Sequence, residues 1–426
     1  MKLNYKRTIL VGFAFFLIQC FWSAYDAIIP IILKNKYGMS ETANGFIMSL
    51  DNILALFMLP LFGSISDKVN TRFGRRTPFI VGGTILAVIF FNILGLVDVL
   101  WLFILVLLLT LISMATFRSP AVALMPDVTC KPHRSKANAI INLMGTIGAM
   151  IVLGLGIVFK TSEVGKTEFS DYILAVTSVM LLALIIFILT VREPKWAEEM
   201  QENTVKYFGD KEAEEREIHG GGLSPEQKRS LILILVSVAL WFIGYNAVIS
   251  KYSLYATHVI KQDFNLTLII AQGAAIIAYF PVGFIASKVG RRKTILAGVI
   301  MLTAAFFMAI FITEHSPVYL MYILFSLAGI AWATINVNSF PMVVELAKGS
   351  DVGKYTGYYY TASMAAQVVT PTLVGIIMDI ANSYRPLFPY ATIFVGLAFV
   401  TMFFVRHGDA KPQPKGLLES LDVDVD

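Results

Sequence analysis

The sequence predicts an all-α membrane protein with twelve transmembrane helices arranged in two six-helix bundles. Of its 426 residues, 57% are hydrophobic and only 15% are charged, whereas a soluble domain has about 25% charged residues. The apolar residues form long continuous runs. A chain inside hydrocarbon must pair its own backbone groups, which leaves helices or a closed barrel. Barrel strands alternate polar and apolar residues, so the continuous runs predict helices.

Each predicted span is close to the roughly 20 residues that a helix needs to cross a bilayer. The first run follows MKLNYKR and is longer than the apolar core of a signal peptide, so we interpret it as a span. The two cysteines, Cys20 and Cys130, have no metal-ligand spacing, and we expect no metal site. The spans are predicted at residues 8–33, 44–66, 78–97, 99–125, 136–159, 171–191, 230–256, 266–287, 293–312, 317–342, 354–380 and 386–405.

The distribution of basic residues predicts that both termini are cytoplasmic. With the N-terminus inside, most of the 34 Lys and Arg residues fall in cytoplasmic segments. Positive charge resists translocation across a membrane, so basic loops stay in the cytoplasm. The expected location is the inner or plasma membrane of the cell, crossed many times by the chain.

The two halves of the chain repeat each other. The loop that ends in GRR at residues 74–76 recurs as GFIASKVGRR at 283–292, and MPDVTCKPHRSKANA at 125–139 matches VVELAKGSDVGKYTG at 343–357. Parallel repeats of this kind are typical of transporters that rock around a site near the bilayer midplane. We therefore expect an N-terminal bundle at 1–191, a cytoplasmic linker loop at 192–229, a C-terminal bundle at 230–410 and an acidic cytoplasmic tail at 411–426.

The stretch FGSISDKVNTRFGRRTPFI, residues 62–80, places small and charged residues between two apolar runs. It resembles the loop 2–3 signature of the major facilitator superfamily, and the second copy has Ser287 where an aspartate would stand. The resemblance implies a cytoplasmic gate of ion pairs. Alternatively, the basic residues of this loop only set the topology, and Asp67 is a solvated residue at the membrane interface. The residues assigned to this gate are Gly63, Asp67, Arg72, Gly74, Arg75, Arg76, Asp127, Arg134 and Glu345.

A finer resemblance concerns the transported substrate. SDKVNTRFGRRTPFI, RSPAVALMPDVT and RSKAN are similar to segments of the sucrose–proton symporters and the related glycoside–pentoside–hexuronide:cation symporters. Melibiose-type members have an acidic residue two positions before the proline of span four, where this chain has Arg118 before Pro120. Their paired span-two carboxylates correspond to Ala55 and Leu59 here. This departure favours a proton over sodium as the coupling ion; facilitated diffusion and an unrecognised sodium site stay open.

Four ionisable residues fall inside the predicted spans: Asp26, Asp51, Arg118 and Lys251. A charge at the bilayer centre costs about 2.5–3.5 kcal/mol on insertion scales and usually faces a partner or cavity. Asp26 and Asp51 are expected at similar depth on adjacent helices, where either could carry the coupled proton. Alternatively, Asp26 reaches the outer surface and the helix dipole stabilises Asp51. Arg118 could bind sugar or a carboxylate, or extend to the cytoplasm, and Lys251 could be an interface residue.

Three tryptophans, Trp22, Trp241 and Trp332, lie near the centres of spans 1, 7 and 10. Tryptophan usually gathers at the membrane interfaces, and these spans line the central cavity in the resembled superfamily. Aromatic rings with a few polar groups suit a sugar site, although buried rings can also simply pack. Asn336 and Asn338 could instead join neighbouring helices. The expected polar binding residues are Tyr25, Asn52, Tyr245, Asn246, Asn336, Asn338 and Gln367, together with Arg118.

The sequence thus predicts a proton-coupled symporter for a glycoside or disaccharide, of the sucrose or maltose type, that works by rocker-switch alternating access. The alternatives are a proton-driven exporter of amphipathic small molecules and a sugar-binding sensor that does not transport. No HExxH or GxSG motif is present, so we expect no enzyme. We expect no cofactor besides the coupled proton, no nucleic acid, a monomer, and a sugar and the lipid bilayer as partners.

Overall fold

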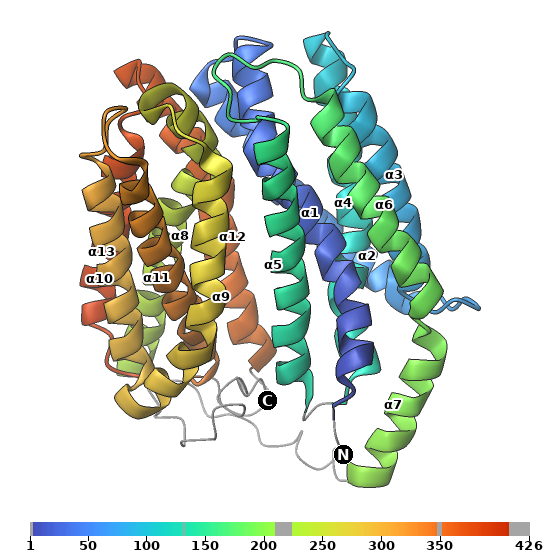
Figure 1. The fold of residues 1–426 in the computed structure, drawn as a ribbon. Coiled ribbons are helices and arrows are strands. Elements are labelled where there is room, and N and C mark those ends of the chain that lie inside the picture. Colours follow the sequence, from blue (N-terminus) through green and yellow to red (C-terminus); the bar gives the residue numbers. More distant parts are fainter. Residues whose placement is uncertain (1–2, 131–132, 209–223, 347–351, 409–426) are drawn as a thin grey trace. The chain divides into compact units, whose positions relative to one another are not determined.

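The computed structural model describes residues 3–130, 133–208, 224–346 and 352–408 (Figure 1). These residues form helices and connecting loops, with no β-strand among them, so the all-helical prediction is confirmed. Within these described ranges, ten helices are long and apolar enough to span a membrane, and two shorter apolar helices cover Phe264–Tyr279 and Leu387–Phe403. The count of twelve spans and the cytoplasmic placement of both termini stay predictions.

The chain divides into two compact units. Unit 1 comprises Met1–Met39 and Leu50–Lys211, and unit 2 comprises Ser40–Ser49 and Glu212–Asp426. One boundary between the units therefore falls inside a continuous helix, α2. The helices of the first half of the chain are α1 (Tyr5–Asn35), α2 (Glu41–Lys68), α3 (Thr77–Leu94), α4 (Leu100–Val128), α5 (Arg134–Val158), α6 (Ser170–Thr190) and α7 (Glu193–Phe208).

In unit 1, α1 packs against α5 and α6, and α3 packs against α4 and α6. Gly148 of α5 lets α1 approach closely, because a Cβ there would lie 2.9 Å from the Phe16 carbonyl oxygen and 3.0 Å from Cys20 Sγ. Aromatic side chains fill the interior; Phe21 and Phe91 meet with ring centroids 5.1 Å apart. This close packing holds α1 against α5 and α3.

Helix α7 lies within the stretch predicted as a linker loop at 192–229. It begins at Glu193, three residues after α6 ends at Thr190. Trp196 is buried, whereas Lys195 and Glu198 are exposed, so α7 has one face turned to the protein. The first part of the linker is therefore a packed helix; residues 209–223 and the predicted tail at 411–426 lie outside the described residues.

Unit 2 contains α8 (Pro225–Tyr255), the π-helical turn η3 (Ala256–Ile260), α9 (Phe264–Val289), α10 (Arg291–Ala309), α11 (Val318–Val344), α12 (Val352–Ala381) and α13 (Leu387–Phe403). Ser224 and Gln227 form a capping box at the start of α8, with Pro225 in its first turn. Helix α8 packs against α12 and α13, and α11 packs against α9 and α10. Gly244 brings α8 close to α13, since a Cβ there would lie 2.8 Å from the Ala391 carbonyl oxygen.

Candidate functional site

The predicted substrate residues of unit 1 come together on α1, α2 and α4. The guanidinium carbon of Arg118 lies 5.4 Å from the centre of the Trp22 ring, within range of a cation–π interaction. Trp22 in turn meets Tyr25 edge to face, with centroids 5.4 Å apart. Trp22 Nε1 and the Tyr25 hydroxyl are buried and have no hydrogen-bond partner among the described residues. Such orphaned polar atoms are costly unless a ligand or water satisfies them.

The two predicted proton-coupling carboxylates belong to the same group. Asp26 lies within electrostatic range of Asp51 and Arg118, and Arg118 interacts with both carboxylates. Asp51 Oδ1 accepts a hydrogen bond from Asn52 Nδ2 at 2.8 Å. Both aspartates are half-buried. One cation is thus placed where it can balance either of two carboxylates at membrane depth.

A second set of aromatic and polar side chains lies in unit 2, on α8 and α11. The rings of Tyr245 and Trp332 stack face to face, with centroids 3.5 Å apart and planes 2° from parallel. Phe242 contacts Trp332 edge to face at 5.2 Å. All three rings are half-buried. The stack joins α8 to α11 through two parallel aromatic rings, and the polar residue Asn246 follows Tyr245 in the chain.

Several buried polar atoms of unit 2 have no hydrogen-bond partner among the described residues. Two of them are Asn246 Nδ2, which follows Tyr245 on α8 and which the sequence predicted as a substrate-binding group, and Gln272 Oε1 of α9, which it did not. A glutamine inside the apolar span at 266–287 was the signal that could have identified it. Because both atoms are buried and lack a hydrogen-bond partner among the described residues, each is a candidate to bond to a polar group of a bound molecule.

The other predicted binding residues of unit 2 are placed differently. Trp241 is 0% exposed, and its buried indole N–H has no partner within the described part of the chain. Asn338 Nδ2 donates to the Thr334 carbonyl oxygen at 2.9 Å, within its own helix, and Gln367 Nε2 donates to Ser363 at 3.3 Å, likewise within its helix. Asn336 is half-buried on α11. Tyr245, Asn246 and Trp332 therefore have the arrangement that best suits a ligand.

Four of the predicted gate residues, Asp67, Arg75, Arg76 and Asp127, form a tight cluster around Arg76 at one end of unit 1. Arg76 Nη2 lies 2.5 Å from Asp67 Oδ1, and its Nε lies 2.7 Å from Asp127 Oδ2. Arg75 Nη2 lies 3.3 Å from the same oxygen of Asp127. Burial by itself would lower the pKa of Arg76, but the bonds to Asp127 and Asp67 outweigh it and raise that pKa. The cluster ties the end of α2 to the start of α3 and the end of α4.

Glu193 completes this cluster and was not predicted. Its carboxylate accepts the backbone N–H groups of Arg75 at 2.6 Å, Arg76 at 2.9 Å and Thr77 at 2.8 Å, and the Thr77 hydroxyl at 2.7 Å. Helix α3 has no capping side chain at its own N-cap residue. The buried carboxylate of Glu193 supplies the cap and a favourable charge at the helix N-terminus. Gly74, with φ at 110°, leaves room for this side chain.

The remaining gate residues have other contacts. Arg72 is exposed and lies over the Phe73 ring at 4.6 Å, and Arg134 donates to the carbonyls of Thr129 and Pro126 at the end of α4. Gly63 lies where a Cβ would come within 2.8 Å of Ser119 Oγ on α4. In unit 2, Glu345 pairs with Arg291. The structure therefore gathers Asp67, Arg75, Arg76 and Asp127 and leaves Arg72, Arg134 and Glu345 outside that cluster.

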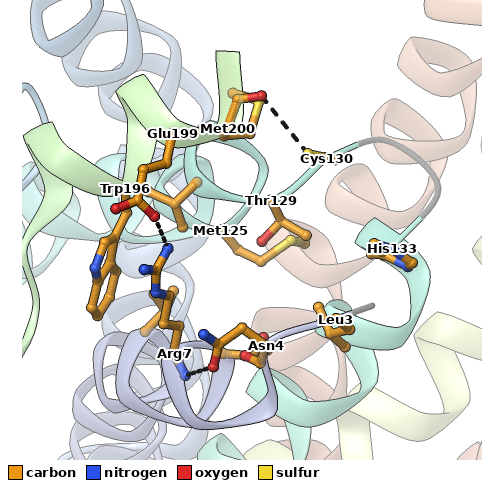
Figure 2. A pocket seen from close by; sticks show the side chains of 13 residues that line it. Leu3, Asn4, Arg7, Met125, Thr129, Cys130, His133, Trp196, Glu199 and Met200 are labelled. Atoms are coloured by element: carbon orange, nitrogen blue, oxygen red, sulfur yellow. Dashed lines mark hydrogen bonds and ion pairs between the residues drawn. The ribbon is translucent and has the colours of Figure 1, made fainter. Parts of the chain in front are cut away.

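A small pocket opens where α1 begins, α4 ends and α7 passes (Figure 2). Arg7 Nη1 lies 2.5 Å from Glu199 Oε2, and its guanidinium carbon lies 5.3 Å from the Trp196 ring centre. The hydrogen bond from Arg7 lowers the pKa of Glu199. A further contact joins α7 to the residues after α4, because Cys130 Sγ lies 3.8 Å from the carbonyl oxygen of Met200. None of the predicted site residues lines this pocket, and its contacts fasten α7 to α1.

Three solved transporters have a similar fold. A point mutant of the nucleoside transporter NupG has a TM-score of 0.67 and 14% identity, covering 93% of this chain and 98% of that one. The xylose transporter XylE from E. coli, in an inward-open conformation, has a TM-score of 0.64 and 15% identity, covering 98% of both chains. A bacterial homologue of the human lysosomal transporter Spinster has a TM-score of 0.68 and 15% identity, covering 95% of this chain and 97% of that one.

No curated protein matches the chain significantly. A family model described as the Major Facilitator Superfamily matches residues 11–272 and 231–421, which together include most of the chain. The helices, the ion-pair cluster around Arg76 and the likeness to solved transporters agree with this match. The chain therefore belongs to the Major Facilitator Superfamily and is a multi-pass membrane protein of that transporter family.

Proposed function

We propose that this transporter is a proton-coupled sugar symporter of the cell membrane that works by alternating access. The observation that carries the proposal is the contact of Arg118 with Trp22 beside Asp26 and Asp51. It combines an aromatic ring, a fixed cation and two acidic side chains at membrane depth. The proposed substrate is a glycoside or disaccharide of the sucrose or maltose type, as the sequence resemblance implies.

The chemistry of the two aromatic groups supports a sugar. A sugar ring has apolar C–H faces and a rim of hydroxyl groups, so its site needs flat aromatic surfaces with polar atoms at their edges. Trp22 is a candidate surface of this kind within unit 1, and the Tyr245–Trp332 stack is a separate candidate within unit 2. The orphaned atoms of Tyr25, Asn246 and Gln272, together with Trp22 Nε1, are the candidates that would meet hydroxyl groups. XylE, one of the similar structures, is a xylose transporter.

Arg118 offers a physical reason for coupling sugar to protons. Arginine stays charged at physiological pH and presents five N–H donors. While Asp26 and Asp51 are both ionised, these donors are attracted to the carboxylates. A proton on either aspartate removes one negative charge and leaves Arg118 donors available to sugar hydroxyls. Proton and sugar then favour each other's binding, as linkage requires.

Uptake by reconstituted protein tests the proposal. Purified protein in proteoliposomes is offered a panel of labelled mono- and disaccharides with and without an imposed pH gradient. Accumulation of one sugar only with the acidic side outside supports proton symport. Binding without flux would support the sensor, efflux of amphipathic compounds driven by protons would support the exporter, and accumulation driven by sodium alone would contradict the choice of coupling ion.

A further inference from the structure

The first turns of α2 belong to unit 2, although the rest of α2 belongs to unit 1. Ser40–Ser49 is grouped with the helices of unit 2, and Leu50 begins the part in unit 1. Inside unit 2 this segment contacts α8, α12 and the loop that precedes α13. A charged residue, Glu41, begins the helix there and is buried. The contacts of Glu41 explain how this short segment is held.

Glu41 and Lys251 form a buried ion pair. Lys251 Nζ lies 2.9 Å from Glu41 Oε2 and also donates to the Glu41 carbonyl oxygen at 3.2 Å. The Lys251 side chain is 0% exposed and that of Glu41 is 5% exposed. The alternative in which Lys251 reaches the membrane surface is therefore not supported. Two charges removed from water in this way are stable only while they stay together.

Neighbouring side chains fix the geometry of the pair. Tyr384 donates its hydroxyl proton to Glu41 Oε1 at 2.6 Å. Burial and the negative charge of Glu41 raise the pKa of Tyr384 well above its usual value, so Tyr384 stays protonated and can donate. The Asp379 carboxylate accepts the backbone N–H groups of Glu41 and Thr42, each at 2.8 Å, and so caps the start of α2.

The backbone of this segment is also in close contact with α12. Gly375 lies against the Glu41 carbonyl, and Gly45 lies against the Pro371 carbonyl, with no space for a Cβ on either glycine. One turn further on, Ser49 Oγ lies 3.4 Å from Thr372 Oγ1. Small residues permit this approach of two helices in a membrane. The first turns of α2 therefore have both a fitted backbone surface and a buried ion pair.

We propose that Glu41 and Lys251 form a latch that holds the first turns of α2 on α8 and α12 in one conformation and opens in the other. Separating the pair leaves two buried charges without a partner, so the open conformation must give both side chains access to water. An ion pair that is present in only one of two conformations shifts their populations. Because α2 continues without a break to Lys68, release of its first turns can accompany movement of the whole helix. The inference rests on alternating access, and it requires neither the sugar nor the proton.

The test follows the exposure of Ser49, which is 1% exposed while the latch is closed. Ser49→Cys is introduced after Cys20 and Cys130 are replaced by alanine, and the protein is placed in nanodiscs that leave both faces accessible. The rate of labelling by a charged, membrane-impermeant maleimide is then measured. Lys251→Met should raise this rate at least tenfold. Lys261→Met is the matched control, because Lys261 pairs with Glu314 at 2.5 Å but is 59% exposed, and it should leave the rate unchanged.

A disulfide cross-link tests directly whether Ser49 of α2 stays next to Thr372 of α12. Ser49→Cys with Thr372→Cys should form a disulfide under mild oxidation, and Lys251→Met should slow its formation several-fold. Glu41→Gln keeps the side-chain volume and an oxygen that can accept from Tyr384, and it should slow the cross-link as Lys251→Met does. Size-exclusion chromatography checks that each variant is folded.

Equal labelling of the Lys251→Met and Lys261→Met proteins would overturn the proposal, and so would failure of the cross-link to form while Glu41 and Lys251 are intact. No substrate is used, so failure of the sugar proposal would leave these results unchanged.

Discussion

Arg76 donates from Nε to the carboxylate of Asp127 at 2.7 Å, although 51 residues separate them in the chain. The bond joins the start of α3 to the end of α4. Arg76 is 4% exposed, so the acids around it, more than water, balance its positive charge. The signature that the sequence shares with its superfamily is therefore a buried ionic junction inside unit 1.

Replacing Asp127 by asparagine should destabilise unit 1. The change removes the charge from a bond to a buried guanidinium, which costs about 1.5–3 kcal/mol, and leaves Asp67 as the acid bonded to Arg76. The thermal midpoint of the purified protein, followed by intrinsic fluorescence, should fall by several degrees. Asp171→Asn, at an exposed position on α6, is the control and should shift it little. An unchanged midpoint for Asp127→Asn would show that the junction contributes nothing to stability.

Glu193→Ala should loosen the start of α3. The substitution removes the side chain that accepts three backbone N–H groups, and loss of a helix cap costs about 0.5–2 kcal/mol. Hydrogen exchange of residues 75–80 should become faster while exchange in α5 stays the same. Glu198→Ala, on the exposed face of the same helix, should leave both unchanged. Identical exchange in the two variants would contradict the capping role.

The contact between Arg7 and Glu199 should depend on pH. The pKa of Glu199 is lower in the folded protein than its ordinary 4.5, because Arg7 donates a hydrogen bond to the carboxylate. The contact therefore stabilises the fold fully above pH 4.5, and this stabilisation is lost as the pH falls through the lowered pKa. Thermal midpoints of the wild type and Glu199→Gln should differ at pH 7 and converge at low pH. A difference that stays constant over this range would contradict the assignment.

Trp332→Ala should weaken sugar binding more than Trp332→Phe. The alanine variant loses the ring on which the sugar is proposed to lie beside Tyr245. With a contact between this ring and the sugar of about 0.5–1.5 kcal/mol, similar to an aromatic pair, the apparent KM should rise up to about tenfold. Trp101→Ala is a suitable control because Trp101 is 67% exposed. A KM that is the same for Trp332→Ala and Trp101→Ala would remove the stack from the sugar site.

The features that the sequence predicted depend on local patterns. Hydropathy was enough for the helices, and the signature at 62–80 was enough to place Arg76 and Asp67 in one cluster. The features it missed depend on distant contacts. Glu193 is 117 residues from Arg76, and Glu41 is 210 residues from Lys251. No local pattern carries that information.

The rotation of a helix was the other unpredictable quantity. Trp241 and Tyr245 lie one turn apart on α8, yet Trp241 is fully buried whereas Tyr245 is half-buried and stacks on Trp332. Depth in the membrane follows from residue number, but the face that a residue presents is set by the packing of neighbouring helices. Gly244, which brings α8 close to α13, is one residue that sets it here.

The central claim is that a carboxylate beside Arg118 couples protons to sugar, and transport by Asp26→Asn and Asp51→Asn tests it most directly. Each variant is reconstituted and assayed twice, for uphill uptake driven by a pH gradient and for exchange of sugar at equal concentrations. The proposed mechanism predicts that at least one variant loses uphill uptake and keeps exchange. An asparagine cannot carry a proton, so the gradient no longer drives uptake, whereas exchange at equal concentrations needs only sugar binding and alternating access. Undiminished, gradient-driven accumulation in both variants would contradict it.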